Sequence, residues 1–534
     1  MTATAELYRS YLDLRWHFDP ATATAAGVKG HDDRLGDFSA DRMREHLVAF
    51  KAIASAAEQL DIEDQDEEID RTAFLDEVRI RIARFEKERP HVHDPGFWLS
   101  HLYRGFHGIL RLRNGSSSDQ AASLLSRLRA APDFLKAARA TIQEPPRIFL
   151  DTATAMAEAG PRLLQDTATA IRSDAPDLGE AADDAAAAAE SELNRFALAL
   201  RGELRAHHDD LSFAIGEEQF NRRLHHEHAL RAGAPELYRY GLHLADEVAH
   251  EVEQLARQIN PSASWRTVVE KIRAESSPDR DLLPAFHDAV GRARSFLEQR
   301  QLVTIPSGRL DVVETPDFLR PLMPFAAYTP PAVYSPDPVG TFYVTTPTVG
   351  TPPGHHSHFE IGPTAVHEAW PGHHLQMLAA RSASSEVRRV SWTPVTVEGW
   401  ALYCEELMAE QGFFTTIEER LFQRLHLLWR AMRVVLDIGL HTRGMTPDQA
   451  VDMLVDRVAM DRGQARAEVS RYCAWPTYQL CYAVGRRELL NLREAWRASV
   501  GPSAPLREFH DAVLGYGGLP VSLIRWGMGL GIDE

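Results

Sequence analysis

The chain has 534 residues and a mass of 59.8 kDa, and its 44% hydrophobic and 25% charged residues are ordinary for a large globular protein. Its formal net charge of −18 argues against nucleic acid as a partner, because nucleic-acid-binding surfaces are rich in Lys and Arg. The three cysteines include no CxxC pair, which argues against a disulfide framework and against a thiolate zinc site.

The first residues of the chain lack a basic segment followed by an apolar run, so they do not resemble a signal peptide. No apolar stretch reaches the roughly 18 residues that a membrane-spanning helix needs. We therefore expect a cytoplasmic protein with no membrane partner.

Residues 1–302 show the periodicity of one helix after another. Apolar residues recur every three or four positions, and Ala, Leu, Arg and Glu predominate. The Ala-rich stretch 179–200 keeps its Leu and Phe at helical spacing, so we expect a helix there rather than a disordered segment. This helical region is predicted to form one side of a cleft.

From residue 303 the composition shifts toward Pro, Thr, Val and aromatic residues, which favours short strands and ordered loops. The best strand candidate is GTFYVTT, which contains Tyr343. Helical patterning returns at about residue 362 and runs nearly to the end of the chain. The prediction is a mostly α protein in which region 303–534 carries a small sheet (303–360) followed by helices (362–534), continuous with the first region.

Residues 363–380, PTAVHEAWPGHHLQMLAA, contain the most specific chemical signal. Zinc hydrolases commonly carry H-E-x-x-H on one helix, because residues four apart share a helix face and both imidazoles reach the metal. Here the pair His367-Glu368 matches the start of that pattern. The second histidine comes later than the pattern requires, so the helix cannot be regular.

Two adjacent histidines, His373 and His374, are candidates for the second ligand. A regular helix would place His374 about 10.5 Å along the axis from His367, too far for two ligands of one zinc. Pro371 removes a backbone N–H and Gly372 accepts unusual dihedral angles, so we expect these two residues to distort the helix. His373 is then the predicted ligand, with His374 as the alternative.

A carboxylate ligand is expected from the next helix, TPVTVEGWALYCEELMAEQGF, residues 393–413. Glu398 lies 25 residues after His373, and Glu405 lies 32 after it. Because they are seven apart, the two glutamates share one helix face. We predict that Glu398 binds the metal and that Glu405 holds an imidazole N–H, with Glu405 as the alternative ligand.

The segments HEAWPGHHLQ and EGWALYCE resemble the signature of the domain-of-unknown-function 885 family of bacterial proteins, and the resemblance extends over nearly the whole chain. That family is similar to gluzincin metallopeptidases. GH at 372–373 and VE at 397–398 match the thimet-oligopeptidase-like pattern H-E-x-G-H…V-E. The resemblance implies a gluzincin-like architecture, with many helices around a cleft and a small sheet before the metal-binding helix.

The resemblance also extends to PTYQLCYAVG, residues 476–485, where the family usually shows P-G-Q-A-x-S-Y-x-x-G. Tyr482 matches, and we expect it to donate its O–H to an oxyanion. Tyr478 stands in place of the family's Gln, so the resemblance gives it no role. Arg471 also matches a family position and is a substrate-binding candidate. Gluzincins pair substrate with an edge strand, which implies the same role for the strand of Tyr343.

These residues predict a zinc-dependent hydrolase of amide bonds with one Zn²⁺ per chain, acting as a peptidase on short peptides or small amides. Glu368 is the expected general base. One alternative is a metal-dependent enzyme that hydrolyses a small metabolite or catalyses an elimination. Another is a non-catalytic metal-bound binding protein, against which Glu368 argues. Other divalent metals, the cleavage position and the oligomeric state stay open.

Overall fold

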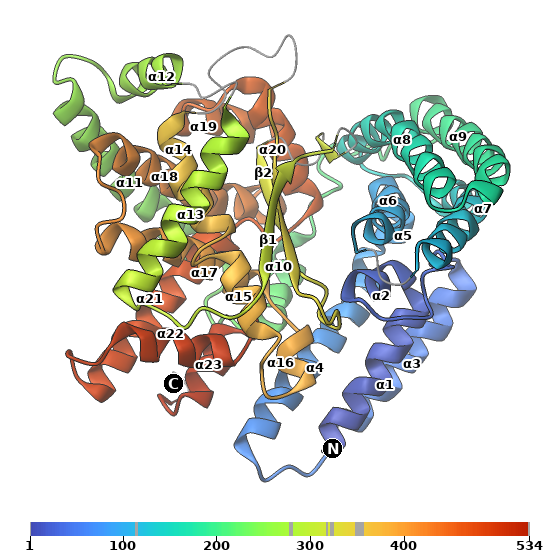
Figure 1. The fold of residues 1–534 in the computed structure, drawn as a ribbon, viewed down its shortest axis with the longest axis horizontal. Coiled ribbons are helices and arrows are strands. Elements are labelled where there is room, and N and C mark those ends of the chain that lie inside the picture. Colours follow the sequence, from blue (N-terminus) through green and yellow to red (C-terminus); the bar gives the residue numbers. More distant parts are fainter. Residues whose placement is uncertain are drawn as a thin grey trace.

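The computed structural model describes residues 2–112, 116–276, 281–316, 319–320, 325–347 and 357–531. Within these ranges the chain is mostly helical and holds one three-stranded sheet, which confirms the predicted class (Figure 1). The Ala-rich stretch forms the helix α9, as its apolar spacing predicts. None of the described helices combines the length and the apolar character needed to cross a bilayer.

In the sequence, one group of helices precedes the sheet and a second group follows it. Those before the sheet are α1 (Ala3–Phe18), α2 (Pro20–Ala26), α3 (Ala40–Glu58), α4 (Gln65–Ala83), η1 (Arg84–Glu88), α5 (Pro90–His93), α6 (Pro95–Leu112), α7 (Ser117–Thr141), α8 (Arg147–Asp174), η2 (Pro176–Leu178), α9 (Gly179–Gly202), α10 (Gly216–His226), α11 (Ala234–Ile259), α12 (Trp265–Glu275) and α13 (Leu282–Arg300). The strands are β1 (Arg309–Glu314), β2 (Ala326–Thr329) and β3 (Val339–Val344). Those after the sheet are α14 (His358–Glu368), α15 (His373–Ala380), α16 (Glu386–Val390), α17 (Pro394–Glu410), α18 (Ile417–Thr442), α19 (Pro447–Val458), α20 (Arg462–Ala474), α21 (Cys481–Val500), α22 (Leu506–Gly515) and α23 (Val521–Gly527).

The sheet has the order β1-β3-β2, with β1 parallel and β2 antiparallel to β3. Because both edges of β3 are paired, the prediction that the strand of Tyr343 serves as an edge for substrate was wrong. The edge strand that contacts α14, the helix that ends with His367 and Glu368, is β2. Tyr343 itself is buried, and its hydroxyl lies 3.4 Å from Nε2 of His107 on α6.

Among the described residues the apolar core forms three clusters, and two of them draw on residues from both sides of residue 302. One joins α1, α3 and α4 to α13, the sheet, α14 and α17. A second joins α11 to α18 and α20, and a third holds α6–α9 together. Figure 1 shows α6–α9 on one side of the sheet and α11, α17 and α18 on the other. Packing therefore crosses residue 302.

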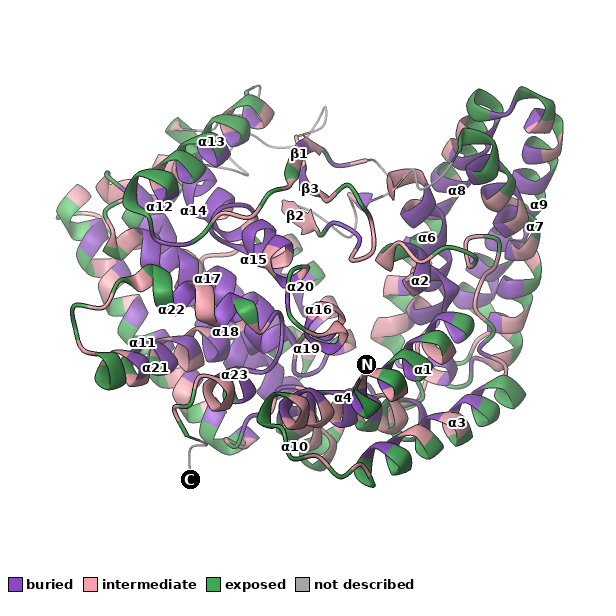
Figure 2. Ribbon diagram, turned by 60° about the horizontal axis from the view of Figure 1, so that its bottom comes forward, coloured by how far each residue is buried: buried purple, intermediate pink, exposed green. Residues whose placement is uncertain are grey.

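Helix α17 is the element that matters most for the site, because it is buried on nearly all sides (Figure 2). Every residue from Pro394 to Met408 is buried, including Glu398, Glu405 and Glu406. Buried carboxylates are rare unless they are paired or bind a metal. The Glu406 carboxylate is paired with Arg424 and Arg486. The carboxylates of Glu398 and Glu405 contact the histidine side chains of the candidate site.

Candidate metal centre

The expected distortion of the helix that carries His367 and His373 is a complete break. α14 ends at Glu368 and α15 begins at His373. Within the break, the N–H of Gly372 donates to the carbonyl of Val366 at 3.0 Å. A Cβ atom on Gly372 would lie 1.9 Å from the carbonyl oxygen of His367, so only glycine fits this close approach. Trp400 Nε1 on α17 donates to the carbonyl of Pro371 at 2.9 Å and holds the break in place.

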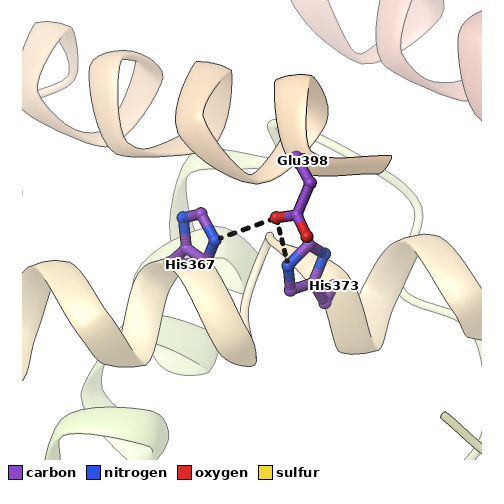
Figure 3. A group of neighbouring side chains, drawn as sticks. All are labelled: His367, His373 and Glu398. Atoms are coloured by element: carbon purple, nitrogen blue, oxygen red, sulfur yellow. Dashed lines mark ion pairs between the residues drawn. The ribbon is translucent and has the colours of Figure 1, made fainter. Parts of the chain in front are cut away.

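The break turns His373 toward His367 and toward Glu398 on α17 (Figure 3). Oε2 of Glu398 lies 3.6 Å from Nε2 of His367 and 3.3 Å from Nε2 of His373. One ligand atom from each of the three residues lies within 4.8 Å of the other two. Ligand atoms about 2.0–2.1 Å from a tetrahedral zinc are about 3.4 Å apart, so this spacing fits one zinc ion.

The two alternative ligands lie elsewhere. His374 is fully buried, and its Nδ1 lies 3.0 Å from the hydroxyl of Tyr328 on β2. Glu405 lies on the far side of the His367 ring, with Oε1 2.8 Å from Nδ1. The structure therefore brings His367, His373 and Glu398 together, places Glu405 behind one imidazole and leaves His374 outside the group.

The charges around the group favour a bound cation. Burial opposes a charge on His367, yet its hydrogen bonds to Glu398 and Glu405 raise its pKa to about 9. Burial would raise the pKa of Glu398, but His373 and His367 hold it well below its ordinary value. A proton or a divalent cation can supply the positive charge that these carboxylates favour. Two imidazoles and one carboxylate are also a ligand set of catalytic zinc sites.

Glu368 is the last residue of α14 and lies next to a predicted ligand. Its side chain is half-buried. Burial raises its pKa, and His367 and His373 only partly offset this, while Glu398 adds to it. A carboxylate whose pKa is raised is a stronger proton acceptor than an ordinary carboxylate, as a general base requires.

Tyr478 is a site residue that sequence reasoning missed. Its hydroxyl donates to Oε1 of Glu398 at 2.5 Å, on the oxygen that does not face the histidines. Asp437 holds the turn that carries Tyr478 by accepting the backbone N–H groups of Thr477 and its neighbours at 479 and 480. Sequence reasoning gave Tyr478 no role because it departs from the family pattern. Its spacing of four from Tyr482 was the available signal, since residues four apart share one side of a helical turn.

Of the other three predicted site residues, only Tyr482 contacts a metal-ligand candidate among the described residues. The ring of Tyr482 stacks on His367 with centroids 6.2 Å apart, and burial raises the pKa of its hydroxyl. Arg471 donates to both carboxylate oxygens of Glu468 at 2.6 and 2.7 Å. Tyr343 contacts His107, and the described residues show no contact between Tyr343 and the three metal-ligand candidates.

Comparison with known proteins gives a family and a fold. The family model described as "Bacterial protein of unknown function (DUF885)" matches residues 20–528. No curated protein matches. A structure of a putative lipoprotein of unknown function from Shewanella oneidensis matches with a TM-score of 0.80 and 22% identity, over 99% of this chain and 100% of that one. A putative lipoprotein from Colwellia psychrerythraea matches with a TM-score of 0.85 and 17% identity, over 99% and 98%.

These comparisons correct the predicted location. Both solved structures are described as putative lipoproteins, which contradicts the expectation of a cytoplasmic protein. That expectation rested on the composition of the first residues and on the length of the apolar stretches, and neither observation tests location directly.

Proposed function

This chain belongs to the DUF885 family of bacterial proteins of unknown function, and we propose from its site that it is a zinc-dependent hydrolase of amide bonds. Its substrates are short peptides or small amides. The observation that carries the proposal is the convergence of His367, His373 and Glu398 with a second carboxylate, that of Glu368, directly beside them. A metal-binding protein without catalysis has no need of that second carboxylate.

The proposal includes a gluzincin-like arrangement of the site. In such a site two histidines come from one helical segment and a glutamate comes from the following helix. Here the histidines lie on either side of the α14–α15 break, and Glu398 lies on α17. The carboxylate of Glu405 behind His367 supports this assignment, because imidazoles that bind zinc commonly donate their other N–H to a carboxylate.

His367, His373 and Glu398 would hold the zinc, which would supply Lewis-acid polarisation and lower the pKa of a bound water. Glu368 would accept a proton from the attacking water and return it to the leaving amine. Tyr482 donates its O–H to the oxygen of the attacked carbonyl as negative charge develops there. Tyr478 keeps Glu398 oriented through its hydrogen bond to Oε1. The edge strand β2 is the place where an extended peptide can pair.

Two substitutions, each of which replaces a carboxylate by a neutral amide of the same shape, test the proposal. Glu368→Gln keeps the shape of the side chain but removes the proton acceptor, so it should keep zinc and lose about 10²- to 10⁴-fold in turnover. Glu398→Gln should lose zinc and activity together, because it removes a charged ligand. The measurements are elemental analysis and digestion of a short-peptide library, with the exposed Glu270→Gln as the matched control.

Each outcome separates the proposal from its alternatives. Parent-like hydrolysis by Glu368→Gln would rule out this carboxylate as the base. A parent protein that binds zinc but cleaves no peptide or small amide would favour either a small-metabolite enzyme or a binding protein.

A further inference from the structure

A group of cationic side chains lies one aromatic ring away from the metal-ligand candidates. The Cζ atoms of Arg430 and Arg433 on α18 lie 5.9 and 4.7 Å from the centroid of the Tyr482 ring. That ring in turn stacks on His367 at 6.2 Å. Two guanidinium groups therefore contact the same ring that stacks on a predicted metal ligand.

These cations outnumber the carboxylates that pair with them. Arg433 donates to Glu468 and to the hydroxyl of Tyr472, each at 3.1 Å. Arg471 donates to the same Glu468 carboxylate at 2.6 and 2.7 Å. The carboxylate of Glu468 thus pairs with two arginines, and it does not pair with the third, Arg430.

Arg430 has few polar partners. Its one hydrogen bond to a described residue runs from Nη1 to the backbone carbonyl of His426 at 3.4 Å, and its buried Nε makes no hydrogen bond to a described residue. No described carboxylate forms an ion pair with it. Burial lowers its pKa, an effect that Glu405 opposes and Arg433 reinforces. The residue is half-buried, and a guanidinium that is partly removed from water and lacks a carboxylate partner gains by binding an anion.

The group has a path to solvent. The side chain of Arg471 is 31% exposed, and the indole of Trp475, 6.0 Å away, belongs to a residue that is 50% exposed. Trp475 also lies 5.7 Å from the ring of Tyr478, which donates to Glu398. A row of aromatic and cationic side chains thus leads from the surface to a predicted metal ligand, and such rows suit ligands that join an apolar body to an anionic end.

We propose that Arg430, supported by Arg433 and Arg471, binds a carboxylate of the substrate, namely the terminal carboxylate of a short peptide. The inference rests on the proposed function and narrows its substrate class. The two distances through the Tyr482 ring, 6.2 and 5.9 Å, place the guanidinium within about 12 Å of His367, the length of about three extended residues. The cleaved bond should therefore lie within about three residues of the C-terminus.

The test compares the full chain, loaded with zinc, with its Arg430→Gln variant on three libraries of acetylated tripeptides. The first library has free terminal carboxylates, the second has terminal amides, and the third ends in glutamate amide, which offers only a side-chain carboxylate. Arg420→Gln, an exposed change on the same helix, is the matched control. Binding is measured by competition and cleavage by mass spectrometry.

The parent and the control should prefer free acids over amides by about 10- to 100-fold, the range for a hydrogen-bonded charged group. Arg430→Gln should lose that preference, and Arg430→Lys should recover part of it. If Arg430→Gln does not fold, Arg471→Gln should weaken the same preference. Preference for the glutamate amide over the plain amide, lost in Arg430→Gln, would also support a carboxylate site but assign it to acidic side chains.

Equal use of all three libraries by the parent, no binding of any library, or an unchanged preference in Arg430→Gln would overturn the inference. These outcomes are distinct from failure of the proposed function. Cleavage without preference keeps the hydrolase and removes the carboxylate site. Preferential binding without cleavage, lost in Arg430→Gln, keeps the carboxylate site and removes the hydrolase.

Discussion

Glu405 accepts a hydrogen bond from Nδ1 of His367 at 2.8 Å, and so fixes the ring with Nε2 facing Glu398. Both glutamates lie on α17, two helical turns apart, so one rigid buried helix sets both sides of the same imidazole. A carboxylate in this position selects the tautomer that can bind a metal through Nε2.

Removing this orienting contact should weaken metal binding without abolishing it. We expect Glu405→Gln, and more strongly Glu405→Ala, to lower zinc affinity by about 10- to 100-fold, because partners of ligand histidines typically contribute this much. Competition with a fluorescent chelator measures the affinity. Glu398→Gln serves as the comparison, and loss of zinc as complete as in that variant would make Glu405 a ligand.

The two neighbouring histidines should differ sharply when each is replaced. His373→Ala removes an Nε2 that lies 3.3 Å from Glu398 and should lose most of the bound zinc. His374→Ala should keep the metal but lower stability, because it removes a fully buried side chain and its contact with Tyr328. Elemental analysis and thermal unfolding distinguish the two effects, and the reverse order of metal loss would make His374 the ligand.

Local spacing is sufficient to predict the helical class and to propose the three metal-ligand candidates. The face shared by Glu398 and Glu405 follows from the helix period alone. The complete break at Gly372 goes beyond what the pattern HEAWPGH indicates, because it depends on Trp400 reaching across from another helix. Local spacing does not predict which residue of a distant segment contacts a given residue in the folded chain.

Two errors show this limit. From the sequence, the strand of Tyr343 is a candidate edge strand. In the structure it pairs with both β1 and β2 and is therefore central, because strand order depends on contacts between distant segments. Tyr478 is separated from Glu398 by 80 residues, and its position depends on a turn held by Asp437 on a third element. Neither relationship leaves a periodic trace in the sequence.

Gly372 should tolerate no side chain. Gly372→Ala would place a methyl group 1.9 Å from the carbonyl oxygen of His367 and 2.4 Å from that of Val366, so the backbone of the break must move. We expect loss of zinc and a lower midpoint of thermal unfolding. Gly291→Ala on α13, where a methyl group meets nothing within 4 Å, is the matched control and should leave stability unchanged or slightly raised. Parent-like zinc content in Gly372→Ala would contradict the need for glycine.

Replacement of Tyr478 should affect zinc affinity, whereas replacement of Tyr482 should affect turnover. Tyr478→Phe removes the donor to Oε1 of Glu398 and should lower zinc affinity by about tenfold while the ring keeps its packing. Tyr482→Phe should keep zinc affinity and reduce turnover by about 10²- to 10³-fold, the range for one oxyanion donor. Chelator competition and peptide hydrolysis, measured on both variants, test this. Loss of turnover in Tyr478→Phe alone would assign the oxyanion contact to that residue instead.

Stability should fall in mild acid because several buried histidines are held neutral, and His510 offers the clearest test. Its Nδ1 lies 2.7 Å from the carbonyl of Leu302 and its Nε2 lies 2.8 Å from the hydroxyl of Tyr403, an arrangement that suits a neutral ring donating at one nitrogen and accepting at the other. Burial lowers its pKa to about 4 from an ordinary value of 6.5. The unfolded chain therefore binds more protons than the folded one between these two values. The contribution of His510 is fully present above about pH 6.5 and is lost as the pH falls toward 4, at up to about 1.4 kcal/mol per pH unit.

His510→Asn keeps a donor for Leu302 but cannot titrate. We expect it to be less stable than the parent at pH 7, because Tyr403 loses its acceptor, yet to lose stability less steeply between pH 6.5 and 4. Urea unfolding at half-unit pH steps measures both quantities, with the exposed His287→Asn as the control that should retain the parent slope. The other buried histidines with lowered pKa, such as His441, keep part of the slope in every variant. An identical slope in His510→Asn and the parent would show that His510 is not the neutral group that this geometry requires.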